Sequence, residues 1–108
     1  MDSDLHLAQI TDENMRWLDR AEPYGFGNPE PVFSAAGLKL SSQPRVLKEK
    51  HLRLALRQEG SSITAVGWNM GDRAASLEPG ALLDAAFTVE ADDFAGGWRI
   101  VLRDLVTR

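Results

Sequence analysis

The chain has 108 residues, of which 44% are hydrophobic and 26% are charged, and its formal net charge at pH 7 is −4. That length supports one globular domain with a real core and is too short for two. No apolar run approaches the roughly 18–20 residues that a membrane-spanning helix needs, and the acidic start of the chain is unlike a signal peptide. Cysteine is absent, which excludes disulfide bonds and cysteine catalysis and fits the cytoplasmic location that we expect.

The charge is unevenly distributed along the chain. Residues 38–57 contain six cationic side chains and one acidic side chain, a net charge of +5 within a protein of −4, so the remaining residues together carry −9. The six cations are Lys39, Arg45, Lys48, Lys50, Arg53 and Arg57, and the acidic residue is Glu49. A basic block of this kind favours an anionic partner, although the total charge argues weakly against nucleic acid.

The first elements expected are a short strand or extended entry over residues 4–10 and a helix over residues 12–21. Thr11 occupies the N-cap position of that helix, and two acidic residues follow it at the positive end of the helix dipole. Ile10 and Met15 have the spacing of a hydrophobic staple across the cap. The sequence therefore predicts a helix that begins directly after Thr11.

A proline- and glycine-rich segment follows at residues 22–33, with the sequence Glu-Pro-Tyr-Gly-Phe-Gly-Asn-Pro-Glu-Pro-Val-Phe. Its prolines and glycines exclude a regular helix or a central strand, because proline lacks a backbone donor and glycine is entropically costly there. The segment also contains three aromatic residues. We interpret it as a structured connector, which either only seats the helix on the sheet or takes a direct part in a binding groove. The connector residues singled out are Tyr24, Gly25, Phe26, Gly27 and Asn28.

From residue 32 onwards the hydrophobic period changes to two, which is typical of strands. Residues 32–40 predict a long first strand with a bend or bulge at Gly37. Residues 51–57 predict the clearest strand, with its leucines facing inward and its basic residues facing outward. The remaining expected elements are turn-forming residues at 41–50, a third strand at 63–70, a helical turn at 71–79, a fourth strand at 82–90, a turn at 92–97 and a fifth strand at 98–106.

Five strands with a helical insertion between the third and the fourth are the element order of an OB-fold. We therefore predict a mainly β protein, a five-stranded OB-fold Greek-key barrel with an N-terminal helix and a short helix between strands three and four. Residues 1–31 would form the N-terminal helix and the connector, and residues 32–108 would form the barrel. In this arrangement the N-terminal part is a tether packed against the outside of the barrel.

Motifs for catalysis are missing from the sequence. The two histidines stand in unrelated contexts, and no nucleophile elbow or metal-binding cluster of His and Asp occurs. Asp92 and Asp93 are adjacent carboxylates, which we interpret as a solvated turn and not as a metal site. We therefore assign no catalytic residue, metal ligand or cofactor to this chain.

A binding face is better supported than a catalytic site. OB-folds bind single strands across strands two and three, flanked by the loops between strands one and two and between strands four and five. Here the first loop and the outer face of strand two carry cations suited to a phosphate backbone, and exposed aromatic rings could stack bases. The predicted DNA-binding residues are Arg45, Lys48, Lys50, His51, Arg53, Arg57, Trp68, Phe94 and Trp98. Packing in the core or at the barrel rim is the open alternative for Trp68 and Trp98, and a solvated outer face is the alternative for the basic strand.

The connector resembles the entry into the C-terminal OB domain of RecJ, the bacterial single-strand-specific exonuclease. In that family a Pro-Phe-Gly-x-Gly-Asn-Pro-Glu-Pro-x-Phe segment joins the catalytic core to the barrel, and Tyr24 here replaces the usual phenylalanine. Residues 50–54, Lys-His-Leu-Arg-Leu, and residues 65–70, Ala-Val-Gly-Trp-Asn-Met, are similar to two strands of the family, with Trp68 in place of phenylalanine. Residues 98–105 are similar to its closing strand.

The resemblance implies a single-stranded-DNA-binding module of a RecJ-type 5′–3′ exonuclease of DNA repair and recombination. In that family the nuclease activity belongs to a DHH-type core that uses Mn2+ or Mg2+, and neither Asp-His-His nor Gly-Gly-His occurs in this chain. We therefore expect no enzyme activity from this chain alone. Its expected partners are single-stranded DNA and the catalytic core of the same polypeptide, with no membrane. The alternative is a structural or protein-interaction domain that supports the nuclease core without binding DNA.

Overall fold

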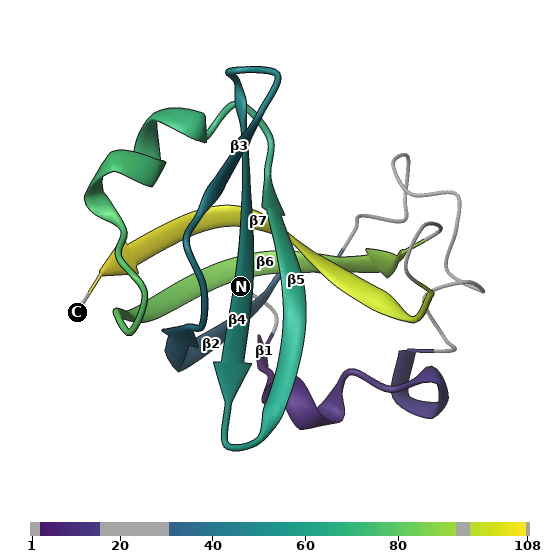
Figure 1. The fold of residues 1–108 in the computed structure, drawn as a ribbon. Coiled ribbons are helices and arrows are strands. Elements are labelled where there is room, and N and C mark those ends of the chain that lie inside the picture. The colour runs from purple at the N-terminus through teal and green to yellow at the C-terminus, as the bar shows by residue number, and fades with distance from the viewer. Residues whose placement is uncertain (1–2, 16–30, 93–95, 108) are drawn as a thin grey trace.

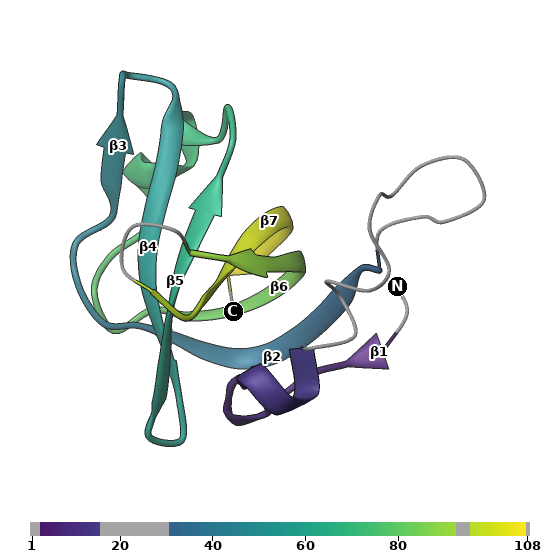
Figure 2. The same ribbon diagram turned by 90° about the vertical axis from the view of Figure 1, so that its right-hand side faces the viewer.

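The fold is known from a computed structural model that describes residues 3–15, 31–92 and 96–107. Within these residues the backbone forms seven strands and two short 3-10 helices, together with the first turn of a helix at residues 12–15 (Figure 1, Figure 2). The bounds are β1 Ser3–Asp4, η1 Leu7–Gln9, β2 Phe33–Leu40, β3 Arg45–Leu47, β4 His51–Gln58, β5 Ser61–Gly67, η2 Gly71–Ser76, β6 Leu82–Ala91 and β7 Trp98–Thr107. No helix in this part of the chain is long and apolar enough to cross a membrane.

Five of these strands close into a barrel. β2 pairs with β6, β6 with β7, β7 with β5, β5 with β4, and β4 returns to β2. The β5–β7 pair is parallel and the other four pairs are antiparallel. The closing contact between β2 and β4 consists of the pairs Lys39–Arg57 and Leu40–Leu56. With η2 between the third and fourth barrel strands, the predicted mainly β OB-fold is confirmed.

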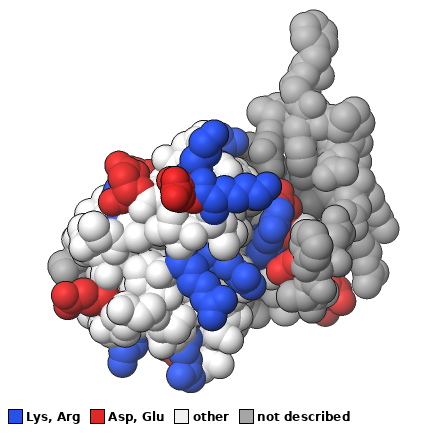
Figure 3. Space-filling model, turned by 45° about the horizontal axis from the view of Figure 1, so that its top comes forward, with Lys and Arg blue, Asp and Glu red and all other residues white. Residues whose placement is uncertain are grey.

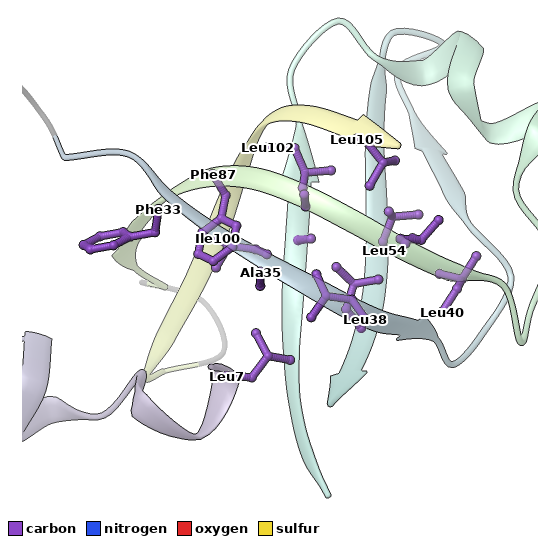
Figure 4. Packing of buried hydrophobic residues seen from close by; sticks show 14 of the residues in the cluster. Leu7, Phe33, Ala35, Leu38, Leu40, Leu54, Phe87, Ile100, Leu102 and Leu105 are labelled. Carbon is purple, nitrogen blue, oxygen red and sulfur yellow. The ribbon is translucent and has the colours of Figure 1, made fainter. Parts of the chain in front are cut away.

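The interior of the barrel is a continuous hydrophobic core (Figure 4). The three leucines of β4 are each at most 1% exposed, whereas Arg53 and Arg57 of the same strand are exposed, which confirms the predicted alternation. Phe87 of β6 is fully buried, and its ring centroid lies 6.4 Å from that of Phe33. The predicted bend of the first strand is also present, because the β2–β6 register shifts between Ala35 and Leu38 and the intervening Gly37 has a φ of +68°.

The N-terminal segment contributes to the same core. Thr11 caps the helix as predicted, because its Oγ1 accepts a hydrogen bond from the backbone N–H of Asn14 at 3.2 Å. Leu7 and Met15 are 4% and 2% exposed and belong to the hydrophobic cluster of the barrel, with Ile10 packed against it. The division of the chain at residues 31 and 32 stays a prediction, and residues 16–30 lie outside the described part.

Three local features differ from the expectations. The expected strand or extended entry over residues 4–10 contains the 3-10 helix η1. The turn-forming stretch at residues 41–50 contains β3, which pairs with β4 as a hairpin. Three residues are too few to show a period of two, so the sequence pattern did not reveal this strand. The third barrel strand ends at Gly67, which leaves Trp68 in the following loop.

The solvated turn predicted at Asp92 is wrong, because this residue is only 8% exposed. Its backbone N–H donates to the carbonyl of Gly97 and its carbonyl accepts from the N–H of Gly96, both at 2.9 Å. These two bonds join the end of the chain segment before residues 93–95 to the start of the segment after them. Asp93 lies outside the described residues.

Candidate nucleic-acid interface

The hairpin of β3 and β4 carries most of the predicted cations. At its tip Lys48 and Glu49 have φ values of +53° and +59°, and the N–H of Lys50 donates to the carbonyl of Leu47 at 3.0 Å. Positive φ at both central residues is the geometry that matches the twist of a hairpin. The tip at residues 48–50 is exposed and stands at the top of the barrel in Figure 1.

Gly71 at the start of η2 holds this tip in place. Its N–H donates to the carbonyl of Lys50 at 2.8 Å. A Cβ atom at position 71 would lie 2.9 Å from the backbone of Lys50, so only glycine permits this approach. The cations at the tip are therefore presented from a fixed position.

Replacing Glu49 by glycine should stabilise the domain by up to about 1 kcal/mol. The left-handed conformation costs a residue with a side chain roughly 1–2 kcal/mol, and the greater flexibility of glycine in the unfolded chain offsets part of that gain. Urea unfolding would measure the difference. Glu49→Gln is the matched control, because it removes the charge without relieving the backbone, and it should leave the stability unchanged. Equal stabilisation by both variants would contradict backbone strain as the cause.

Two pairs of cations face each other across neighbouring strands. Arg45 of β3 is directly opposite Arg53 of β4, and Lys39 of β2 is directly opposite Arg57 of β4. All four side chains are exposed, and within the described part of the chain none of them forms an ion pair. Like charges directly opposite each other destabilise a sheet. This arrangement is suited to an anionic ligand that supplies the missing negative charge.

A shallow groove lies among these cations on the outer surface of β4 and β5. It consists of two adjoining hollows of about 240 and 500 Å³, which share Ala55 and Thr64. The smaller hollow is bordered by Arg45 and Arg53, and the larger one by Arg57 and by the buried Asp92. We call these two hollows the basic groove. Residues of the β2–β3 and β6–β7 loops flank the basic groove. Figure 3, in which the top of the barrel is turned toward the viewer, shows Lys and Arg side chains gathered on this surface.

Trp98 lies at one border of the basic groove. It is the first residue of β7, is partly buried, packs against the core and lines the larger hollow. Its indole Nε1 donates to Asp12 Oδ1 at 2.7 Å. The ring therefore serves the packing of the barrel rim and also borders the groove, so the two interpretations of the sequence are not exclusive here.

Trp68 lies outside the basic groove, beside the hairpin. It is 48% exposed, which excludes a core position. Its ring meets that of His51 edge to face with centroids 5.0 Å apart, and the guanidinium carbon of Arg99 lies 5.9 Å from its centroid. His51 Nδ1 accepts from the N–H of Asn69 at 3.1 Å, which leaves Nε2 as the protonated nitrogen of the neutral ring. The two rings form an aromatic pair in which Trp68 is exposed and His51 is partly buried.

The structure brings some of the predicted residues together and leaves others apart. Arg45, Arg53, Arg57 and Trp98 surround the basic groove, whereas Lys48 and Lys50 lie at the hairpin tip and His51 and Trp68 lie beside it. Phe94 and the five connector residues lie outside the described part. Lys39 was missing from the predicted surface although it belongs to the basic block, because its position opposite Arg57 depends on closure of the barrel.

Another, larger hollow lies elsewhere. It has about 640 Å³ and is bordered by the N-terminal segment, β2, β6 and β7. Asp4, Asp84 and Asp104 line it, and no described lysine or arginine does. These carboxylates repel phosphate and no described lysine or arginine of this hollow offsets them, whereas the basic groove has three arginines and one carboxylate, Asp92; the basic groove is therefore the candidate for anion binding. Among the described residues, no group of three or more His, Cys, Asp or Glu side chains could hold a metal ion.

Comparison with protein families matches residues 1–103 to the RecJ OB domain. The chain belongs to this family. Among solved structures, the RecJ OB domain described here is similar to RecJ from Thermus thermophilus, solved in complex with Mn2+, with a TM-score of 0.66 and 27% sequence identity. The match covers 98% of this chain and 15% of that chain.

Two aminoacyl-tRNA synthetases have similar structures. A putative aspartyl-tRNA synthetase from Leishmania major Friedlin has a TM-score of 0.66 and 14% identity, over 96% of this chain and 20% of that chain. Asparaginyl-tRNA synthetase from Pyrococcus horikoshii has a TM-score of 0.58 and 18% identity, over 72% of this chain and 20% of that chain. At these identities the likeness shows the fold alone. A search of curated protein sequences found no match.

Proposed function

We propose that this RecJ OB domain is the single-stranded-DNA-binding module of a RecJ-type 5′–3′ exonuclease. The observation that supports this most directly is the pair of in-register cations Arg45 and Arg53, which have no acidic partner in the described structure and border a groove on the second and third barrel strands. The family match and the place of the groove, on the face that OB-folds use, point to the same function.

In this function the cations hold phosphates and the aromatic rings hold bases. A strand that follows the basic groove passes Arg53 and Arg57, and the small side chains of Ala55 and Thr64 leave room for it to approach the sheet. Trp98 offers a stacking surface at the groove, which a base has to be unpaired to reach. A single strand offers both a phosphate backbone for the cations and unpaired bases for the aromatic ring, and a duplex offers only the phosphate backbone.

The remaining parts of the proposal concern the whole nuclease. The chain spans 15% of the Thermus RecJ chain. We propose that cleavage, and the Mn2+ or Mg2+ that it uses, belong to a catalytic core of the same polypeptide in the cytoplasm. Residues 32–108 would be the barrel unit and residues 1–31 the link to that core, with Tyr24 to Asn28 as its joint. The chain alone would have no nuclease activity.

Fluorescence anisotropy with a short labelled oligonucleotide tests the proposal. Single-stranded DNA should bind with little sequence preference, and the affinity should fall as salt rises. For single strands the logarithm of the binding constant falls by about 0.7 per contacted phosphate for each logarithmic unit of salt, so four contacts predict a slope of about −3. No binding at low salt, or equal affinity for duplex DNA, would contradict the proposal.

The acidic hollow of about 640 Å³ favours a second candidate function, docking of the nuclease core without DNA binding. Val106 at its border is 56% exposed, so the hollow offers a partner protein both an apolar side chain and carboxylates. Calorimetric titration of the domain with the separately produced core would test this function. Core docking would be selected over DNA binding by two results together. The domain should bind the core, with a weaker affinity when Asp84→Asn and Asp104→Asn are combined, and it should have no affinity for single-stranded DNA.

A further inference from the structure

We propose that Asp12 is a positioning residue for the basic groove, because it holds the indole of Trp98 in the orientation in which a base stacks on it. This role presupposes the proposed function. It is based on the hydrogen bond from Trp98 Nε1 to Asp12 Oδ1, which is 2.7 Å long. The bond joins the N-terminal helix to the opening of the groove across 86 positions of sequence.

The Asp12 end of this hydrogen bond is fixed by the helix to which it belongs. Asp12 is the first helical residue after the N-cap Thr11, whose side chain accepts from Asn14 and whose carbonyl accepts from the N–H of Met15 at 2.8 Å. Met15 is 2% exposed in the core, so this turn of helix is anchored to the barrel. The carboxylate is thus held at a defined place.

The Trp98 end is fixed by the sheet. Trp98 pairs with Ala91 at the end of the β6–β7 ladder, and its ring packs against the core. The same ring lines the larger hollow of the basic groove together with Arg57 and Thr64. The hydrogen bond to Asp12 further restricts the rotation of the indole. A base that stacks on a ring already held in place does not have to order it first.

Electrostatics alone predicts the opposite effect for Asp12. Its side chain is exposed, and a carboxylate beside a phosphate-binding groove weakens the binding of an anionic strand. If Asp12 acted only through its charge, removing the carboxylate would tighten binding. If it positions Trp98, removing the hydrogen-bond acceptor weakens binding. The two roles therefore differ in the sign of the effect.

Three single variants separate these roles in anisotropy titrations at low salt. Asp12→Ala should weaken single-stranded-DNA binding about threefold to tenfold, the range expected for ordering one side chain on binding. Asp12→Asn keeps a carbonyl acceptor for the indole and removes the charge, so it should bind as tightly as the wild type or more tightly. Glu13→Ala is the control for charge, because it removes an equal charge from the same turn. The Glu13 side chain forms no hydrogen bond with the described residues, so this variant should bind slightly more tightly.

A double-mutant cycle with Trp98→Phe tests the partner. Phenylalanine keeps an aromatic face and has no N–H, so Trp98→Phe should weaken binding about as much as Asp12→Ala. In the Trp98→Phe background Asp12→Ala and Asp12→Asn should no longer differ. Both Asp12 variants lose the same interaction with the helix dipole, and alanine has a higher helix propensity than asparagine, so weaker binding by Asp12→Ala than by Asp12→Asn is not due to a less stable helix.

The indole N–H of Trp98 provides a readout without DNA. Its hydrogen exchange, followed by NMR, should be faster in Asp12→Ala than in the wild type and in Asp12→Asn. If the wild type binds and Asp12→Ala binds as tightly or more tightly, the positioning role is overturned and the proposed function is not. Absence of binding by the wild type would overturn the proposed function and this role with it.

Discussion

Replacing Arg45 and Arg53 together by glutamine should reduce the affinity for single-stranded DNA about 10–100-fold at low salt, while the domain becomes as stable as the wild type or more stable. The loss of affinity follows because each guanidinium contributes a charge-assisted contact to phosphate, worth about 1.5–3 kcal/mol before partial replacement by water or by the glutamine amide. The salt slope should become shallower by about 1.4, which is two contacts at 0.7 each.

The stability of the same variant should change in the opposite direction to its affinity. Arg45 and Arg53 are directly opposite each other and have no acidic partner among the described residues, so the folded domain carries a repulsion that glutamine removes. Glutamine keeps most of the aliphatic stem, so packing over the strand is retained. Urea unfolding and anisotropy on the same samples would give both quantities.

The matched control is Arg103→Gln. Arg103 is an exposed arginine of β7 that borders the hollow at Trp68 and not the basic groove. Its replacement should change the affinity less than threefold. If Arg103→Gln lost as much affinity as each of the two groove arginines, the effect would be one of overall charge. If the Arg45 and Arg53 double variant lost stability together with affinity, a binding role for this pair would be contradicted.

The sequence was sufficient for the barrel because its strands differ locally from its loops. Alternating leucines and basic residues over β4 predicted which side chains are buried, and Thr11 predicted the start of the helix. The bulge at Gly37 followed from the absence of a side chain within a strand pattern. Each of these features depends on residues within a few positions of one another.

The parts of the candidate site that the sequence did not reveal depend on pairing between distant segments. Lys39 is opposite Arg57 only because β2 and β4 close the barrel, and Arg45 is opposite Arg53 because a three-residue strand forms before the hairpin. Asp92 is buried where its backbone bonds to Gly96 and Gly97, across the turn from it, which a pair of adjacent aspartates does not indicate. The spacing of hydrophobic residues along a segment does not say which residues of another segment lie opposite it.

Truncating Leu7 and Met15 together to alanine should remove about 4–10 kcal/mol of unfolding free energy, which is most of the stability of a domain this size. Both side chains are at most 4% exposed in the barrel's hydrophobic cluster, and each large-to-alanine change in a core costs about 2–5 kcal/mol. The total stability of such a domain is about 5–15 kcal/mol. Urea unfolding of the double variant and of each single variant would measure the loss and its additivity.

This prediction decides what the N-terminal segment is for. Val106→Ala is the control, because Val106 is 56% exposed and its truncation should change the stability by less than about 0.5 kcal/mol. A loss below about 2 kcal/mol in the Leu7 and Met15 double variant would make the segment a tether on the outside of an independent barrel at residues 32–108. The predicted larger loss would make it part of the folding unit. In that case Asp12 reaches Trp98 from an element that the barrel needs in order to fold, and the candidate groove depends on the N-terminal segment for both its stability and its geometry.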